Sequence, residues 1–435
     1  MADDRAKISE RMRADWNRRA REDANYYVAF GARDQDEAAF LASATDEVRT
    51  FEAELQRFPT REGLKALEIG CGPGRLMKLL NRHFAEIHGV DVSDEMIRLA
   101  RERLRDLPHA HPHLTSGAGL AQFADESFDY VFSYAVFQHI PNREVVLEYM
   151  RETRRVLKPG GIFHGQFNGR AHLVSPDTWS GVFFTGDEIA RFTRENDFQL
   201  LNLDGPGTQY MWTTWRKKPV PPAAPAPGPP VIRRVTNAYS GEPLIPNRGR
   251  QAALAIWTKY LPPECELNNL DVLVEGVSAP PFYIGPASAD GLQQVNTWLP
   301  QPIRTGLLPV ELLLEGRRLC DPAIARLFLA GPNIPRIVAV TDGCSIAVKS
   351  VSLSGALKIH VEEVVSPSKL SATVDGQPVE WIDITCIDPR PPRHEIDIRL
   401  PRELPAGWHR VVVHVGGCEL HTDIETKTPS RAVCP

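Results

Sequence analysis

The sequence predicts two kinds of fold in one chain: an α/β region with an open, doubly wound, mostly parallel sheet, followed by an all-β region. Three observations predict this division. Up to residue 217, apolar segments alternate between strand-like and helix-like patterns, which specifies a sheet with helices on both faces. Residues 217–230 are dominated by proline and alanine. After them, short strand patterns recur at an offset of about 100 residues, the size of one β-sandwich.

The elements of the α/β region alternate with clear boundaries. An N-cap at Ser93 and a Lys-Pro-Gly-Gly turn at 158–161 separate some of them, and a turn at 204–207 joins two extended runs into a hairpin that adds an antiparallel strand. The expected order is strand, helix, strand, helix, strand, helix and strand, at 64–70, 74–84, 86–93, 94–104, 128–137, 143–157 and 162–167.

The proline-rich run marks the clearest domain boundary. It cannot pack into a core and favours extended polyproline II, so residues 218–230 are expected to form a semi-rigid linker. The α/β domain is expected to fold and bind its ligand without the rest of the chain. The predicted domains are 1–217, 231–330 and 334–424.

The all-β region contains an internal repeat. Val-Thr-Asn at 235–237 returns as Val-Thr-Asp at 340–342, and LDVLVEG at 270–276 returns as LSATVDG at 370–376. The pattern resembles the IPT/TIG group of immunoglobulin-like (Ig-like) domains, which implies two tandem sandwiches. Four tryptophans fall inside strand patterns and are expected in the cores: Trp257, Trp298, Trp381 and Trp408.

Charge and composition narrow the class of protein. The formal net charge is −5 and no basic cluster is present, so nucleic acid is not an expected partner. No segment has the pattern of a signal peptide or of a membrane-spanning helix, which predicts a cytoplasmic protein without a membrane span. The seven cysteines lack paired spacing, and we expect no metal site.

The segment ALEIGCGPGR, at 66–75, places three glycines within five positions at the end of a predicted strand. It does not fit the dinucleotide fingerprint, because Arg75 or Met77 stands where the third glycine would be, and no Lys-Ser/Thr pair follows as in a phosphate loop. The remaining pattern is Glu-x-Gly-x-Gly-x-Gly, at Glu68, Gly70, Gly72 and Gly74.

This pattern resembles motif I of the class I S-adenosylmethionine-dependent methyltransferases. Asp91, at the end of the next strand, resembles the carboxylate that accepts the ribose hydroxyls in that family. The segments FDYVFSYAVFQHIPN and RRVLKPGGIFHGQF resemble its later motifs, and the resemblance covers about residues 15–217. It implies a Rossmann-like, seven-stranded sheet, S-adenosylmethionine as cofactor, and methyl transfer to a nucleophile. Implied cofactor-binding residues are Glu68, Gly70, Cys71, Gly72, Gly74, Asp91, Val92, Met96, Gly119, Leu120, Ser133 and Phe137.

His139 follows the fourth strand, where the family places residues beside the transferred methyl group. A neutral imidazole could deprotonate a hydroxyl, or His139 could order its loop without moving a proton. One departure from the family is Ala118, which stands where many relatives carry an acidic residue for the adenine amino group. Contacts with the acceptor are expected for Trp16, Tyr26, Tyr27, Gln138, Gln166 and Asn168, each of which also suits a purely structural role.

The predicted function is methyl transfer to an oxygen or nitrogen atom of a small molecule, peptide or glycan. The two β-domains are expected to recruit the acceptor or a partner, or to mediate self-association. In the alternative, the chain is mainly a binding or scaffold protein whose Ig-like repeats bind glycan or protein, and methyl transfer is secondary.

Overall fold

The structure is a computed structural model of the 435-residue chain. It divides into two compact units, one with residues 1–24 and 41–330 and one with residues 25–40 and 331–435. Among the described residues, no helix combines the length and the apolar character needed to cross a membrane. The described residues are 2–29, 35–58, 60–169, 178, 181–219, 228–249, 251–331, 334–343, 345–364, 370–389 and 392–427.

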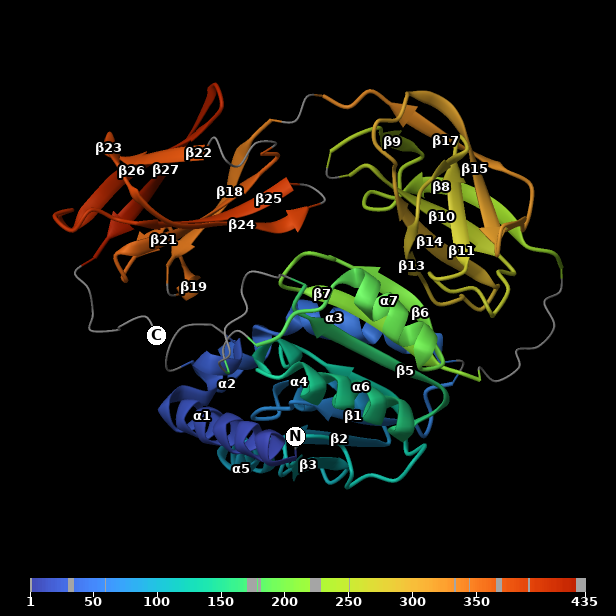
Figure 1. Ribbon diagram of the computed structural model, residues 1–435, viewed down its shortest axis with the longest axis horizontal. Helices are drawn as coiled ribbons and strands as arrows, with labels where there is room; N and C mark the ends of the chain where they lie inside the picture. The colour runs from blue at the N-terminus through green and yellow to red at the C-terminus, as the bar shows by residue number, and fades with distance from the viewer. Residues whose placement is uncertain are drawn as a thin grey trace. The chain divides into compact units, whose positions relative to one another are not determined.

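The α/β part of the chain begins with three helices and then alternates strands with helices (Figure 1). Its helices are α1 (Ala2–Ala29), α2 (Glu37–Ala42), α3 (Thr45–Glu54), α4 (Arg75–Leu80), α5 (Asp94–Arg103), α6 (Arg143–Val156) and α7 (Gly186–Glu195), with 3₁₀ turns η1 (Leu55–Arg57), η2 (Asn81–His83) and η3 (Phe137–His139). Its strands are β1 (Lys65–Ile69), β2 (Glu86–Asp91), β3 (Ala110–Leu114), β4 (Phe128–Ser133), β5 (Leu157–Phe167), β6 (Phe198–Asp204) and β7 (Met211–Lys217).

These seven strands lie in the order β3-β2-β1-β4-β5-β7-β6. Strands β1 to β5 pair in parallel, and β7 pairs antiparallel with both neighbours, so the predicted doubly wound sheet and its hairpin are confirmed. The Lys-Pro-Gly-Gly segment differs from the expectation, because it lies inside β5. There Phe128 pairs with Leu157 and Tyr130 with Ile162, so the extra residues of β5 form an irregularity at Gly160, whose φ is +77°.

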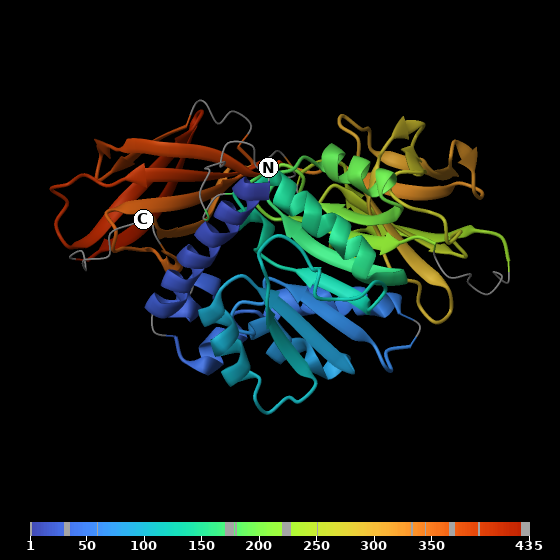
Figure 2. The ribbon, with the colours of Figure 1, turned by 60° about the horizontal axis from the view of Figure 1, so that its bottom comes forward.

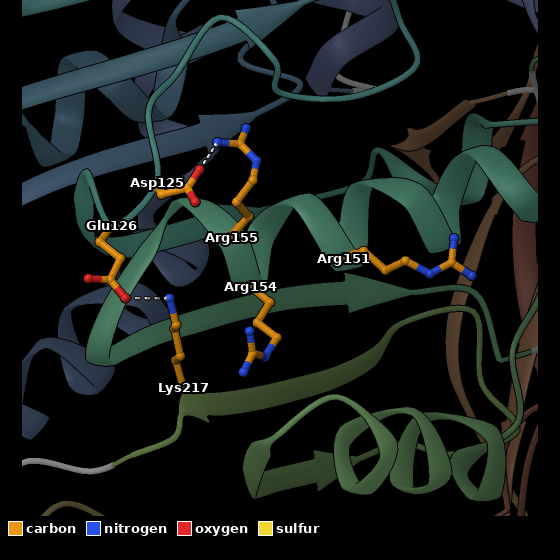
Figure 3. Close-up of a pocket in the computed structure, with 6 residues that line it drawn as sticks. All are labelled: Asp125, Glu126, Arg151, Arg154, Arg155 and Lys217. Atoms are coloured by element: carbon orange, nitrogen blue, oxygen red, sulfur yellow. Dashed lines mark hydrogen bonds and ion pairs between the residues drawn. The ribbon is translucent and has the colours of Figure 1, made fainter.

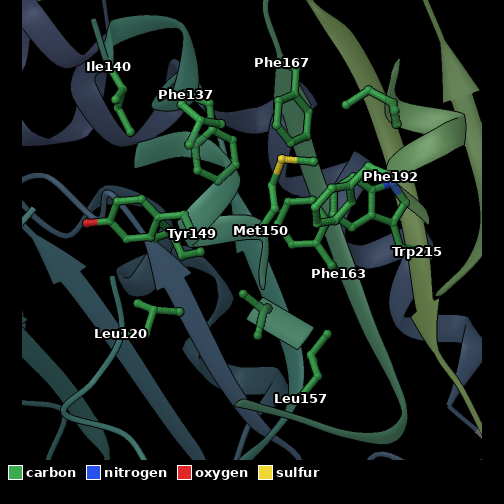
Figure 4. Close-up of a cluster of buried hydrophobic side chains, with 14 of the residues drawn as sticks. Leu120, Phe137, Ile140, Tyr149, Met150, Leu157, Phe163, Phe167, Phe192 and Trp215 are labelled. Carbon is green, nitrogen blue, oxygen red and sulfur yellow. The ribbon is translucent and has the colours of Figure 1, made fainter. Parts of the chain in front are cut away.

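The sheet has an apolar core on each face, as the period of two along a strand requires. Val131 of β4 faces one core, which contains side chains of α1, α6 and α7. Phe128 also belongs to this core, and the pairing of β4 with β5 shifts in register between Phe128 and Tyr130. Tyr130 and Phe132 face the other, with α3, α4 and α5. Figures 1 and 2 show the helices on both faces, and Figure 4 shows the aromatic side chains that fill the first core.

The first β-domain continues the same sheet. Its strands β13, β14, β10 and β8 follow β6, which gives eleven strands, and Tyr283 of β13 pairs antiparallel with Asn202 of β6. The other layer has the order β12-β11-β15-β17-β9, with β16 beside β15. The strands of the first β-domain are β8 (Val231–Asn237), β9 (Leu244–Pro246), β10 (Ala253–Lys259), β11 (Leu270–Val274), β12 (Val277–Ser278), β13 (Pro281–Ile284), β14 (Leu292–Trp298), β15 (Gly306–Leu314), β16 (Arg317–Arg318) and β17 (Ala323–Phe328).

The second β-domain has two five-stranded sheets, β19-β18-β21-β25-β24 and β20-β27-β26-β22-β23. Trp408 was expected in its core but is 69% exposed, because it stands on the outer side of β26. Its strands are β18 (Arg336–Asp342), β19 (Ser345–Lys349), β20 (Val351–Ser352), β21 (Ala356–Glu362), β22 (Leu370–Val374), β23 (Gln377–Pro378), β24 (Glu380–Pro389), β25 (Pro392–Arg399), β26 (Gly407–Val415) and β27 (Cys418–Thr426).

The two β-domains share one strand order. The run β13-β14-β10-β8 corresponds to β24-β25-β21-β18, and β12-β11-β15-β17-β9 corresponds to β23-β22-β26-β27-β20. The copies differ at both edges of this sheet. Among the described strands, β13 is bonded to β6 whereas β24 ends its sheet, and β18 is bonded to β19 whereas β8 ends its sheet. The central part of the predicted linker, 220–227, lies outside the described residues.

Candidate active site

The glycine loop connects β1 to α4. Gly70, Gly72 and Gly74 all have positive φ, at +74°, +51° and +83°. A Cβ atom at Gly70 would lie 2.2 Å from Cγ2 of Val136, so only glycine lets this loop lie against the loop after β4. The N–H groups of Gly70 and Cys71 donate to the carbonyl of Val90 at 2.8 and 2.9 Å, which ties the loop to β2.

Asp91, at the end of β2, joins the two parts of the predicted motif. Its Oδ2 accepts a hydrogen bond from the N–H of Gly72 at 3.0 Å, and its Oδ1 accepts one from the N–H of Ser93 at 2.8 Å. Burial raises the pKa of Asp91 to about 6, although these two hydrogen bonds act in the opposite direction. The carboxylate therefore lies where a ligand on the glycine loop would meet it.

Glu68 is a buried carboxylate beneath the loop. Its side chain is 3% exposed, and its Oε2 has no hydrogen-bond partner among the described residues. Burial raises the pKa of Glu68 to about 8, Arg75 acts against this, and Asp91 adds to it. The carboxyl accepts a backbone hydrogen bond from Met77, so the orphaned atom is Oε2 alone. A buried oxygen without a partner is costly, and a ligand with positive charge would satisfy it. The sulfonium and ammonium groups of S-adenosylmethionine fit this requirement.

Helix α1 closes the edge of the sheet where β2 and β3 end. The guanidinium of Arg13 donates to the carbonyls of Val92 and Thr115, each at 3.2 Å. Oδ1 of Asn17 accepts from the hydroxyl of Ser93 at 2.7 Å and from the N–H of Glu95 at 3.0 Å. The sequence analysis missed Arg13 and Asn17, although their spacing of four residues places them on one face of the helix.

The segment after β3 contains the position of the expected adenine contact. The hydroxyl of Thr115 donates to the carbonyl of Gly119 at 3.0 Å, and the N–H of Leu120 donates to Oε2 of Glu152 at 3.2 Å. Glu152 comes from α6 and so brings an acidic group to the neighbourhood where Ala118 has none. No local pattern pointed to Glu152, because it lies 32 residues from Leu120 in the sequence.

Four residues predicted for catalysis or acceptor binding lie together near the carboxyl ends of β4 and β5. They are Trp16, Gln138, His139 and Gln166. The ring of Trp16 lies edge-on to His139, with centroids 5.3 Å apart, and the guanidinium of Arg19 lies 4.8 Å from the Trp16 centroid. Nε2 of Gln138 lies 3.3 Å from Nε2 of His139, and Nε2 of Gln166 donates to Oε1 of Gln138 at 3.2 Å. His139, Gln138 and Gln166 are all buried.

The other predicted residues have mainly structural contacts. The hydroxyl of Ser133 donates to the carbonyl of Ile69 at 3.0 Å, and the ring of Phe137 stacks on Phe167 in the core (Figure 4). Met96 is buried, and its N–H donates to the N-cap hydroxyl of Ser93.

The remaining predicted acceptor contacts are Asn168, Tyr26 and Tyr27. The carbonyl of Asn168 accepts from the N–H of Phe184 at 2.9 Å, and the Asn168 side chain is buried. Tyr26 and Tyr27 belong to the second unit, where their rings meet edge-on at 5.2 Å.

A hollow of about 430 Å³ lies elsewhere in the α/β domain and contains none of the motif residues (Figure 3). Its cations are already paired, for example Arg155 with Asp125 at 2.8 Å and Lys217 with Glu126 at 3.3 Å. Among the described side chains, no group of three or more His, Cys, Asp or Glu is arranged to hold a metal ion. The hollow is lined by Asp125, Glu126, Arg151, Arg154, Arg155 and Lys217.

Replacing Glu68 by glutamine should stabilise the ligand-free protein at pH 8. A carboxyl whose pKa rises from 4.5 to about 8 on folding contributes full stability below about pH 4.5 and loses it as the pH rises through 8. Glutamine mimics the protonated form, so the Tm of Glu68→Gln should exceed that of the wild type at pH 8 and equal it near pH 4.5. Thermal unfolding across this pH range measures the effect. Glu102→Gln, at a side chain that is 65% exposed, should behave as wild type, and an equal pH dependence in all three proteins would contradict the assignment.

Residues 67–164 match the family model described as a methyltransferase domain. Over 181 residues the chain is 35% identical to a trans-aconitate 2-methyltransferase of Rhodopseudomonas palustris, and this covers 41% of the chain and 66% of that protein. Over 102 residues it is 37% identical to a ubiquinone biosynthesis O-methyltransferase of Ruegeria pomeroyi, which covers 23% of the chain and 39% of that protein. The solved magnesium protoporphyrin IX methyltransferase of Synechocystis is 15% identical with a TM-score of 0.38, over 47% of the chain and 98% of that protein.

The family match shows a methyltransferase domain at residues 67–164, in agreement with the family resemblance found in the sequence. The chain spans just under two thirds of the length of the first relative and less than half of the second.

Proposed function

We propose that the chain transfers the methyl group of S-adenosylmethionine to an oxygen or nitrogen atom of a small molecule. The observation that carries this proposal is the pair of carboxylates on either side of the glycine loop. Glu68 is buried with an orphaned oxygen, and Asp91 is bonded to Gly72 at the end of the adjacent strand. A ligand with a cationic end and a ribose satisfies both.

Bound S-adenosylmethionine would supply an electrophilic methyl group. Glu68 would offset the positive charge, Asp91 would accept the ribose hydroxyls, and Arg13 and Asn17 would hold α1 over the site. His139 would accept the proton of the nucleophile, and the bond between Gln138 and Gln166 would keep its loop in place. Alignment of acceptor and methyl group then provides most of the rate enhancement.

A small, acidic acceptor is supported by the residues around His139. Arg19 is 8% exposed and lies over the ring of Trp16, which contacts His139, and its Nη1 donates to the carbonyl of Thr178 at 3.2 Å. A guanidinium in such a position suits a carboxylate on the acceptor. The relatives named for trans-aconitate and for ubiquinone biosynthesis suggest the first compounds to test: trans-aconitate and a phenolic acid.

Calorimetric titration with S-adenosylmethionine tests the cofactor, with NAD as the control ligand. We expect micromolar affinity for the first and none for the second. Transfer of a labelled methyl group to trans-aconitate and to a phenolic acid then tests the acceptor. Absence of S-adenosylmethionine binding by the folded protein would overturn the proposal, whereas binding without transfer to either compound would exclude these acceptors only.

His139→Ala should lower kcat by about 100-fold or more while the Kd of S-adenosylmethionine changes little, because a general base acts on the acceptor. The acidic limb of the pH–rate profile should disappear with the imidazole. His139→Gln keeps a hydrogen-bonding side chain, so its activity separates the two roles: recovery in this variant would mean that His139 orders the loop and moves no proton. His421→Ala, in the second β-domain, serves as the matched control, since that side chain is 51% exposed.

A further inference from the structure

The sheet edge formed by β6 is joined to the first β-domain by the strand pair β6–β13 and by further hydrogen bonds. The N–H of Leu267 donates to the carbonyl of Leu200 at 2.8 Å. Oε2 of Glu266 accepts from the N–H of Leu200 at 2.9 Å, while its Oε1 accepts from Nζ of Lys218 at 2.8 Å. Glu266 is 5% exposed, so its charge-assisted bond with Leu200 is buried, whereas the Lys218 side chain is 39% exposed.

A buried ion pair lies at the same junction. Nε of Arg57 donates to Oε2 of Glu54 at 2.5 Å, and Nη2 of Arg57 donates to the carbonyl of Ile284, in β13, at 2.8 Å. The two side chains are 1% and 4% exposed. Burial raises the pKa of Glu54, but the charge of Arg57 and hydrogen bonds from Arg57 and Thr214 bring that pKa below its ordinary value. The pair is therefore ionised and depends on a carbonyl of the β-domain.

The hydrogen bonds continue from Glu54 into the centre of the sheet. Thr214 of β7 donates to Glu54 and lies opposite His164 of β5, whose Nδ1 is 2.8 Å from the Thr214 hydroxyl. Burial lowers the pKa of His164 to about 4, so the ring is neutral and its Nδ1–H donates to Thr214. Arg216 and the hydroxyls of Tyr130 and Tyr283 also face this region.

Stacked rings carry the connection from His164 to the active-site loop. Trp212 lies nearly parallel to His164, with centroids 5.0 Å apart, and nearly parallel to Tyr134, at 5.6 Å. Tyr134 follows β4 directly and precedes Ala135, a residue with φ of +54° whose N–H donates to Oε1 of Gln166 at 3.0 Å. Gln166 is bonded to Gln138, beside His139.

We propose that Arg57 is a positioning residue through which the first β-domain fixes the loop Tyr134–His139. This inference rests on the proposed function, in which that loop borders the methyl acceptor. The carbonyl of Ile284 holds Arg57, Arg57 holds Glu54, and Glu54 holds Thr214 and His164 under the rings of Trp212 and Tyr134. The first β-domain is then part of the enzyme's catalytic structure and does more than recruit an acceptor.

The test uses the full chain with Arg57→Ala, Arg57→Lys and the control Arg49→Ala, whose side chain on α3 is 73% exposed. NMR spectra of labelled histidines report on His164 and His139, with His164→Gln and His139→Gln used for assignment. In Arg57→Ala, the pKa of His164 should rise from about 4 toward the ordinary 6.5, because Glu54 keeps its charge and loses its cation. The His139 resonances should shift or broaden. Arg57→Lys should restore most of both signals, and Arg49→Ala should leave them unchanged.

Binding of S-adenosylmethionine should stay within about threefold of wild type in the Arg57 variants, since Glu68 and Asp91 are untouched. A folded Arg57→Ala protein with unchanged His139 resonances would overturn the inference. So would a change in His139 that lysine does not restore, because it would indicate general loosening of the fold. Failure of the wild type to bind S-adenosylmethionine would overturn the proposed function, while the histidine spectra would still decide on the connection.

Discussion

Asp91→Ala should weaken S-adenosylmethionine binding by about 100-fold or more. The proposed ribose contact consists of two charge-assisted hydrogen bonds of roughly 1.5–3 kcal/mol each, and about 1.4 kcal/mol is equivalent to a factor of ten. The substitution also frees the N–H groups of Gly72 and Ser93, so the glycine loop loses its tie to the end of β2. Calorimetric titration measures the change.

The matched control for this variant is Asp106→Ala, at a carboxylate that is 76% exposed and remote from the loop. It should bind like the wild type. Asp91→Asn should fall between, because an amide oxygen can accept one of the bonds without a charge. Wild-type affinity in a folded Asp91→Ala protein would show that the ribose lies elsewhere.

A chain that ends at residue 218 should be insoluble or should unfold about 10 °C or more below a chain that ends at residue 330. Truncation at 218 removes β13, so β6 becomes an exposed edge strand, and such edges promote aggregation. It also removes Glu266 and the carbonyl of Ile284, which leaves Arg57 and the backbone of Leu200 without their partners. Each lost partner costs about 1–3 kcal/mol, and about 1 kcal/mol corresponds to roughly 2–4 °C in a domain of this size.

Scanning calorimetry and size-exclusion chromatography of the two truncated chains measure this difference. The longer chain keeps the whole eleven-stranded sheet and should bind S-adenosylmethionine like the full protein. A monomeric 1–218 chain with the same Tm and Kd would support the expectation, drawn from the proline-rich run, that the α/β domain is independent. That result would contradict the role assigned to the first β-domain.

The sequence was sufficient for features that depend on residues close together in the chain. The glycine spacing, Ser93 as N-cap and the alternation of strands and helices are local patterns, and the structure contains each of them. The position of Asp91 beside the glycine loop could be predicted because the two parallel strands of a βαβ unit end side by side. Composition at 217–230 predicted a domain boundary there, whereas in the structure the sheet continues from β6 to β13.

Other features had no local pattern. The bonds from Arg13 to Thr115 and from Glu152 to Leu120 join segments 102 and 32 residues apart. The continuation of the sheet from β6 to β13 depends on a single strand of four residues, and the proline-rich run suggested separation at that point. Arg57 and Glu54 resemble an ordinary helix-surface pair in the sequence, since only the tertiary fold buries them.

The two β-repeats share one strand order but differ in the strand β13 of the first copy and its counterpart β24 in the second. The similarity between the copies covers the strands inside each sandwich, whereas β13 and β24 share neither length nor sequence: one has four residues and the other ten. In the first copy this strand, β13, is short and extends the sheet of the α/β domain. The second copy kept a long strand with two irregularities in its pairing, and such bulges discourage the addition of further strands. This one strand therefore separates the copy whose sheet extends that of the α/β domain from the copy whose sheet ends at β24 among the described strands.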